Sequence, residues 1–198
     1  MLTTLIALLV IIAAYLIGSV CSAVIVSELF DLPDPRLEGS KNPGATNVLR
    51  LAGPKYAALV LVADILKGTL PVCLGSLLNA SSTVLAIVCL AAVLGHIYPL
   101  FFDFKGGKGV ATALGALIGF APLIGLLVLA TWILIAYFSR YSSLASILSI
   151  GLAPFFIGFD VGSMATFIPI LLMAAMVLYQ HKNNMLRLWQ GEEPKIKI

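Results

Sequence analysis

The chain has 198 residues, of which 61% are hydrophobic and only 11% are charged, and its mean hydropathy is +1.08. A soluble domain of this length needs a polar shell, so the composition excludes an ordinary soluble protein and indicates one embedded in lipid. The net charge of +3 gives no reason to expect a nucleic-acid partner.

Long apolar runs follow one another along the chain with only short polar breaks, as spanning helices require. They lie at about residues 3–27, 57–78, 83–102, 110–138, 144–159 and 163–179. The first run has no basic stretch before it and no small-residue cleavage site, so we interpret it as a retained helix. Three cysteines fall inside these runs, which predicts small buried thiols rather than disulfides. They are Cys21, Cys73 and Cys89.

The basic residues predict which breaks lie in the cytoplasm. Eleven of the twelve lysines and arginines fall at 31–56, at 103–108, at position 140 or in the tail. The positive-inside rule places these segments in the cytoplasm and the linkers at 79–82 and 158–162, which lack Lys and Arg, outside. The N-terminus is then outside and the C-terminus cytoplasmic, provided that run 110–138 breaks near 119–122 and crosses twice. The prediction is an all-α, polytopic membrane protein of seven helices, some of them short; a re-entrant hairpin at 110–138 fits the charges equally well.

The first cytoplasmic segment is dense in small and hydrogen-bonding residues. Glycines let backbone N–H groups approach a phosphate, hydroxyl and amide side chains add donors, and an arginine pairs bidentately with phosphate oxygens. A polar turn that caps a helix explains the same composition equally well. The candidates for phosphate binding are Gly39, Ser40, Asn42, Gly44, Thr46, Asn47 and Arg50.

A glycine-rich turn with two lysines, KGGKG, comes directly before the apolar run that begins at 110. Such a turn presents free N–H groups and the positive end of a helix dipole to an anion. It is not a Walker A loop, because Lys108 is followed by glycine rather than by Ser or Thr. A basic loop that binds lipid headgroups is the alternative. The candidates are Lys105, Gly106, Gly107, Lys108, Gly109 and Thr112.

Five other ionisable or amide side chains need an explanation. His181 and Asn184 are three apart after the last run, so a continuing helix places them on one face, although a solvated basic tail fits equally well. Asp64 and Lys67 lie inside the second run, where each would cost about 2.5–3.5 kcal/mol if unpaired, so we predict a structural ion pair. His96 is more often structural than catalytic in such a position, and the two histidines and three cysteines match no metal-ligand spacing.

Three stretches, GSKNPGATNVLR, GHIYPLFFDFKGGKGVAT and HKNNMLRLWQGEEPK, together with DILKG at 64–68, closely resemble the bacterial acyl-phosphate:glycerol-3-phosphate acyltransferases of the PlsY type. The resemblance spans nearly the whole chain. It implies a single membrane-embedded acyltransferase domain, 1–198, in the bacterial inner membrane, with seven helices and a site facing the cytoplasm. It implies acyl phosphate and glycerol 3-phosphate as substrates, with membrane lipids as surroundings. We expect no cofactor, no metal and a monomer, although the sequence does not decide the oligomeric state.

The resemblance also implies roles for individual residues. Ser40 and Arg50 are expected to be needed for activity, the glycine loop with Lys108 to bind glycerol phosphate, and His181 and Asn184 to assist. Glu193 matches a glutamate that is structural in the family. Two departures are Lys41, where glycine is common, and Asn183, which replaces a usual acidic residue.

The implied reaction joins two anionic substrates, so the site mainly needs cations and donors. The base is either His181 or the phosphate of a substrate, and the sequence does not decide between them. The acyl-chain preference is equally undetermined. Two other classes of protein remain as alternatives to an enzyme, a carrier for a phosphorylated solute and a lipid-binding scaffold. Each would also have a basic, glycine-rich binding site.

Overall fold

The computed structural model describes residues 1–161 and 163–196, and every regular element in this part of the chain is a helix, as predicted. Residue 162 of the expected outer linker and Lys197 of the basic tail lie outside the described residues. The helices are α1 (Leu2–Gly18), α2 (Ser22–Leu29), α3 (Ala45–Ala52), α4 (Pro54–Leu77), α5 (Ser82–Ile97), α6 (Val110–Phe120), α7 (Pro122–Ser139), α8 (Ser142–Val161), α9 (Met164–Gln180) and α10 (Lys182–Gln190).

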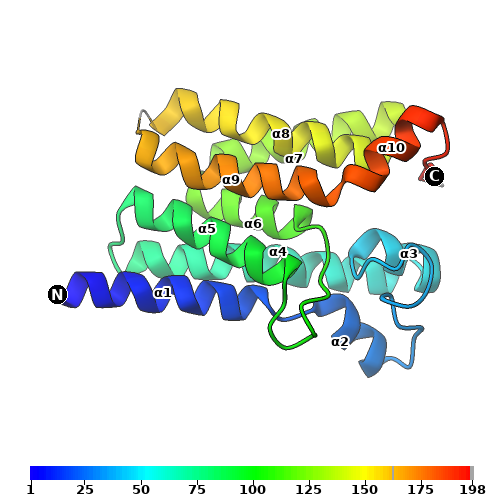
Figure 1. Cartoon of the computed structure of the whole chain (residues 1–198), viewed down its shortest axis with the longest axis horizontal. Coiled ribbons are helices and arrows are strands. Elements are labelled where there is room, and N and C mark those ends of the chain that lie inside the picture. Colours follow the sequence, from blue (N-terminus) through cyan, green and yellow to red (C-terminus); the bar gives the residue numbers. More distant parts are fainter. Residues whose placement is uncertain (162, 197–198) are drawn as a thin grey trace.

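The helices form a bundle with one elaborated end. Figure 1 shows α1 and α4–α9 lying along a common direction, whereas α2, α3 and α10 gather at the end that holds the C-terminus. By length and composition, two described helices can cross a membrane, α4 and α7. The number rises to four if two bent pairs each count as one span, α1 with α2 (44°) and α9 with α10 (52°).

Two of the apolar runs are interrupted. The run at 3–27 is not one straight helix, because it bends between α1 and α2. The run at 110–138 breaks at Ala121, inside the predicted window, where Pro122 begins α7 at a position that needs no N–H donor. The two halves fold back on each other so closely that a Cβ on Gly125 would lie 2.7 Å from the Cα of Ile118.

Small residues bring α6 close to α4. A Cβ on Gly115 would meet the carbonyl oxygen of Ile65 at 2.0 Å, and one on Gly68 would meet that of Thr112 at 2.1 Å. The Thr69 hydroxyl donates across the contact to the Gly115 carbonyl (2.8 Å). Close backbone approach and interhelical hydrogen bonds are what hold helices together in lipid, where burial of apolar surface adds little. The contact therefore fixes the KGGKG turn, which leads into α6, against α4.

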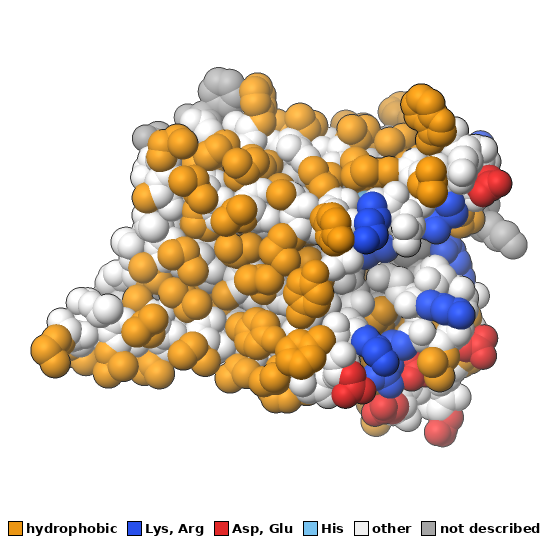
Figure 2. All heavy atoms as spheres, in the orientation of Figure 1, with side chains coloured by type: hydrophobic (Ala, Val, Ile, Leu, Met, Phe, Trp, Pro, Cys, Tyr) orange, Lys and Arg blue, Asp and Glu red, His pale blue; other side chains and the backbone are white. Residues whose placement is uncertain are grey.

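The surface divides into an apolar body and a charged end. Figure 2 shows hydrophobic side chains over most of the visible face, with lysines, arginines and carboxylates gathered at the end of α3 and α10. Large apolar side chains such as Leu66 and Leu126 are half exposed on the body. Cys21 and Cys89 are buried as expected, but the prediction for Cys73 was wrong: its thiol lies on the apolar outer surface of α4.

Candidate active site

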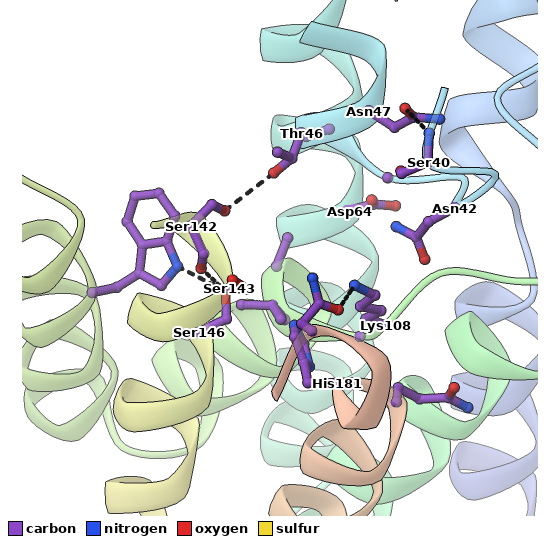
Figure 3. Close-up of a pocket in the computed structure, with 18 of the residues that line it drawn as sticks. Ser40, Asn42, Thr46, Asn47, Asp64, Lys108, Ser142, Ser143, Ser146 and His181 are labelled. Atoms are coloured by element: carbon purple, nitrogen blue, oxygen red, sulfur yellow. Dashed lines mark hydrogen bonds between the residues drawn. The ribbon is translucent and has the colours of Figure 1, made fainter. Parts of the chain in front are cut away.

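A cavity of about 490 Å³ opens at the charged end of the bundle, with walls from α3–α10 (Figure 3). It brings together segments that are as far apart in sequence as residues 40 and 193. The predicted residues that line it are Ser40, Asn42, Gly44, Thr46, Asn47, Arg50, Asp64, Lys108, Gly109, His181, Asn184 and Glu193. The predicted residues that do not line it are Gly39, Lys67, Lys105, Gly106, Gly107 and Thr112.

The loop before α3 is held in place by Asn47. Its buried side chain accepts a hydrogen bond from the Ser40 backbone N–H (2.9 Å) and donates to the carbonyls of Pro35 and Glu38 (3.0 Å each). Gly39 packs on the same amide, since a Cβ there would lie 2.4 Å from Asn47 Oδ1. Asn47 and Gly39 therefore shape the loop, and the loop presents Ser40 to the cavity.

Lys41 adopts a backbone conformation that favours glycine, with φ +55°. This backbone conformation explains why glycine is common at this position in the family. Arg50, near the end of α3, lines the cavity, and its guanidinium forms no salt bridge within the described chain. An unpaired guanidinium at a cavity wall is free to bind an anionic ligand.

The KGGKG turn is positioned by its glycines. The Gly107 N–H donates to the His96 carbonyl (3.2 Å), and a Cβ on Gly107 would lie 2.3 Å from His96 Nε2. Gly109 adopts a left-handed conformation (φ +87°) as it leads into α6. A larger residue at Gly107 would displace the turn, so this glycine serves to place Lys108, whereas Gly109 also lines the cavity.

Lys108 belongs to a chain of polar contacts that joins three segments. Its ammonium donates to Asn184 Oδ1, and Asn184 Nδ2 donates to Glu193 Oε1 (2.7 Å). Arg187 Nε donates to the other oxygen of the same carboxylate (2.7 Å). Glu193, buried in the C-terminal segment, thus fixes Asn184 and through it Lys108, which supports the structural role expected for it.

The charges in this chain perturb one another. Burial lowers the pKa of Lys108 from 10.5 to about 8, with Glu193 opposing the shift and the positive charges of Arg187 and Arg50 adding to it. Burial raises the pKa of the Glu193 carboxyl, but its hydrogen bonds and the charge of Arg187 outweigh this and hold the pKa below its usual value. Burial therefore destabilises the charged form of Lys108, and an anionic ligand in the cavity would stabilise that form again.

His181 stands at the junction of α9 and α10, where the chain bends by 52° instead of continuing as one helix. Its side chain is only 3% exposed, and Nδ1 donates to the Val177 carbonyl (2.8 Å), since a carbonyl can only accept. Burial, together with the charge of Lys108, lowers the pKa of His181 to about 4. The imidazole is therefore neutral near pH 7, with the lone pair of Nε2 available as an acceptor.

A second polar cluster packs against the KGGKG turn. The predicted ion pair is confirmed, with Lys67 Nζ 2.8 Å from Asp64 Oδ1, and Lys67 also donates to the Val20 carbonyl (2.7 Å). His96 Nδ1 lies 3.1 Å from the Thr112 hydroxyl and 3.6 Å from Asp64. Thr112 is therefore engaged with His96, while Asp64 and His96 reach the cavity wall.

Sequence reasoning missed the wall made by α7 and α8. Trp132 Nε1 donates to the Ser146 hydroxyl (3.0 Å), and the Ser142 hydroxyl lies 3.3 Å from that of Thr46 across the cavity (Figure 3). The signal was present as serines at 142, 143 and 146, which a helix places on one face. Other lining residues outside the predicted site include Gln180, Arg187 and Pro194, and Asn183, noted above only as a departure from the family, lines the cavity too.

The fold and the cavity define an α-helical membrane protein that gathers cations and hydrogen-bond donors beside apolar side chains, the requirements of a site for phosphorylated, lipid-like ligands. The family model "Glycerol-3-phosphate acyltransferase" matches residues 8–191. The chain belongs to this family of enzymes.

Several similar proteins are glycerol-3-phosphate acyltransferases. The glycerol-3-phosphate acyltransferase of Legionella pneumophila (strain Corby) is 57% identical over 95% of this chain and 68% of its own length. That of Methylococcus capsulatus is 50% identical over 92% of both chains.

Two solved structures of PlsY (YgiH), an integral membrane glycerol 3-phosphate acyltransferase, have the same fold. The glycerol 3-phosphate form is 40% identical, with a TM-score of 0.92 and 96% of both chains covered. The lysophosphatidic acid form is 38% identical, with a TM-score of 0.89 over 96% of this chain and 95% of that one.

Proposed function

We propose that this protein transfers a fatty acyl group from acyl phosphate to the sn-1 hydroxyl of glycerol 3-phosphate, giving 1-acyl-glycerol 3-phosphate and inorganic phosphate. The observation that carries the proposal is that Arg50, Lys108 and their neighbours share one cavity, in which they face an apolar wall. The solved relatives were captured with glycerol 3-phosphate and with lysophosphatidic acid, which are the acceptor and the product of this reaction.

The topology that serves this reaction has seven spans in one domain, with the N-terminus outside and the cavity at the cytoplasmic face of the bacterial inner membrane. The basic residues at the charged end of the bundle support this orientation, since they are enriched on the cytoplasmic side. Short helices such as α6, with 11 residues, need a locally thin bilayer or protein around them. We expect the monomer to be the working unit in phospholipid synthesis.

In the proposed reaction, the sn-1 oxygen forms a bond to the acyl carbonyl carbon, and the bond from that carbon to the phosphate oxygen breaks. The electron pair leaves with inorganic phosphate, and the hydroxyl proton passes to a base. Both substrates are anionic, so the main task of the site is to hold two phosphates close together. Lys108, Arg50, Ser40 and Asn184 supply charge and donors for this task.

The base is better supplied by a substrate than by the protein. A histidine with a pKa of about 4 is a weak proton acceptor, whereas the second pKa of a phosphate monoester is about 6. We therefore assign the proton to a substrate phosphate. His181 Nε2 accepts a hydrogen bond from the attacking hydroxyl and orients it, which its fixed tautomer allows.

The family's usual acidic residue at position 183 is an asparagine here, so no carboxylate from that position takes part, although Asn183 does line the cavity. The remaining carboxylates at the cavity, Asp64 and Glu193, are both engaged by cations. Neither is placed to exchange a proton with a substrate freely, which agrees with a reaction that needs no protein carboxylate as acid.

The test is turnover by purified protein in detergent with palmitoyl phosphate and glycerol 3-phosphate. We expect lysophosphatidic acid and inorganic phosphate in equal amounts, and no product from acyl-CoA or from thioesters of acyl carrier protein. Folded protein that gives no product would refute the proposal. Flux of unchanged glycerol 3-phosphate into vesicles would instead identify a carrier, and product formed equally from thioesters would refute the assignment of the donor.

A further inference from the structure

The loop between α5 and α6 presents large apolar side chains that line no part of the cavity. Leu100, Phe101 and Phe104 are 45%, 58% and 55% exposed, and none of them belongs to the hydrophobic core of the described chain. Large apolar side chains gathered at one place on a surface indicate that something other than water covers them. These three come immediately before the KGGKG turn.

The backbone of this loop forms a compact turn. The N–H groups of Phe102 and Phe104 both donate to the Pro99 carbonyl, at 3.1 and 3.0 Å. The Lys105 N–H donates to the Phe102 carbonyl (3.0 Å). Asp103 and Phe104 adopt left-handed conformations, with φ +53° and +57°, which a bulky side chain seldom adopts. The turn therefore directs aromatic side chains outward at a cost in backbone strain, and a favourable contact at the tip would offset that cost.

The loop lies where the apolar body of the bundle meets its charged end. Figure 1 shows it in green, projecting beside the bend between α1 and α2, and the Tyr15 hydroxyl of α1 donates to the Tyr98 carbonyl at its base (2.9 Å). In the same orientation, Figure 2 shows hydrophobic side chains extending from the body to this part of the surface, with charged side chains beyond it. The apolar tip is thus continuous with the surface that faces lipid.

Two charged residues limit how deeply the tip can enter the bilayer. Asp103 and Lys105 flank Phe104, and both are exposed. A charged side chain is costly in hydrocarbon, whereas aromatic rings favour the interface between lipid and water. A lysine there can place its apolar stem along the lipid and its ammonium in water. This combination of side chains fits the headgroup level of the bilayer rather than bulk water or the hydrocarbon interior.

We infer that the apolar tip of this loop, residues 100–104, binds the headgroup region of the bilayer, with its aromatic rings among the lipids and the charges of Asp103 and Lys105 in water. Lipid is the occupant because the tip continues the lipid-facing surface of the body. Since Lys105 begins the KGGKG turn, the contact also holds that turn at the level of the headgroups. The inference does not depend on the reaction, because it concerns only where the loop lies.

The test is tryptophan fluorescence of the full chain in phosphatidylcholine vesicles. Phe101→Trp places an indole at the tip, and the wild-type protein gives the signal of Trp132 and Trp189 that is subtracted. Three quenchers are compared: lipids brominated near the headgroup, lipids brominated near the end of the acyl chain, and iodide on both sides of the membrane. If Phe101→Trp does not fold, Phe104→Trp probes the same tip and is subject to the same expectation.

Two matched variants calibrate the signal. Leu126→Trp lies on the apolar body and should be quenched by brominated lipids but little by iodide. Leu37→Trp lies between Arg36 and Glu38, at a leucine that is 72% exposed, and should be quenched by iodide but not by brominated lipids. For Phe101→Trp, we expect bromines near the headgroup to remove about half of the added signal, more than chain-end bromines or iodide remove, because the ring lies at the interface.

Three results would overturn the inference. Quenching of Phe101→Trp by iodide alone, as for Leu37→Trp, would place the tip in water. Protection from all three quenchers would show that a second copy of the chain or another protein covers it. Stronger quenching by chain-end bromines would place it in the hydrocarbon interior. Wild-type protein without acyl transfer would refute the proposed function and leave this measurement unaffected, so the two failures are distinguishable.

Discussion

The proton on Lys108 gives the sharpest test of the site's electrostatics. Burial lowers the pKa of this lysine to about 8, and the proposed reaction needs the charged form to hold glycerol 3-phosphate. A group with pKa 8 is about 91% protonated at pH 7 and about 9% at pH 9, so kcat/KM for glycerol 3-phosphate should fall about tenfold between these values. The substrate phosphate, with a second pKa of about 6, is about 91% dianionic at pH 7 and more so at higher pH, so it contributes no such fall.

The assay is the initial rate of lysophosphatidic acid formation at subsaturating glycerol 3-phosphate from pH 6.5 to 9.5, with a blank without enzyme at each pH to correct for spontaneous donor hydrolysis. Lys108→Arg is the matched variant, because arginine stays charged throughout and should remove the alkaline fall even if its overall rate is lower. A wild-type profile that is flat to pH 9, or an arginine variant that keeps the fall, would refute the reasoning.

Three further predictions test the network around Lys108. Glu193→Gln removes the negative charge that opposes the fall in the pKa of Lys108, so the alkaline fall in kcat/KM should move below pH 8, while the exposed Glu192→Gln leaves the profile unchanged. Gly107→Ala places a methyl group 2.3 Å from His96 Nε2 and should lower stability by about 1–3 kcal/mol in thermal unfolding, whereas Gly151→Ala, whose added carbon has no neighbour closer than 3.9 Å, should not. His181→Gln should lower kcat but keep an acid fall near pH 6, because that fall belongs to the substrate phosphate; its disappearance would make His181 the base.

The sequence predicted the parts of the fold that depend on hydropathy and charge. The break in run 110–138 followed from counting basic segments, and Pro122 supplied the local reason for it. The Asp64–Lys67 ion pair followed from the cost of unpaired charge in lipid. The bends between α1 and α2 and at His181 could not be predicted, because they depend on which helices pack together at the charged end.

The residue types of the site could be predicted from the sequence, but the role of each residue could not. Asn47, Gly107 and Thr112 all looked like ligands for phosphate, yet Asn47 and Thr112 are hydrogen-bonded within the protein and Gly107 packs on His96. Spacing cannot distinguish a donor aimed at a ligand from one aimed at a neighbouring loop. Ser142, Ser143 and Ser146 were overlooked because a serine in an apolar run is usually an interhelical contact, and only the structure shows that these three line the cavity.

The central claim is that the loop before α3 and the KGGKG turn meet at one face of the membrane. Single cysteines at Lys41 and at Lys105, both exposed, introduced after replacing Cys21, Cys73 and Cys89, allow labelling with a membrane-impermeant maleimide in inverted and right-side-out vesicles. We predict that both positions are labelled in inverted vesicles and neither in right-side-out vesicles. Labelling of the two positions from opposite faces would contradict a shared cavity, and with it the proposed reaction.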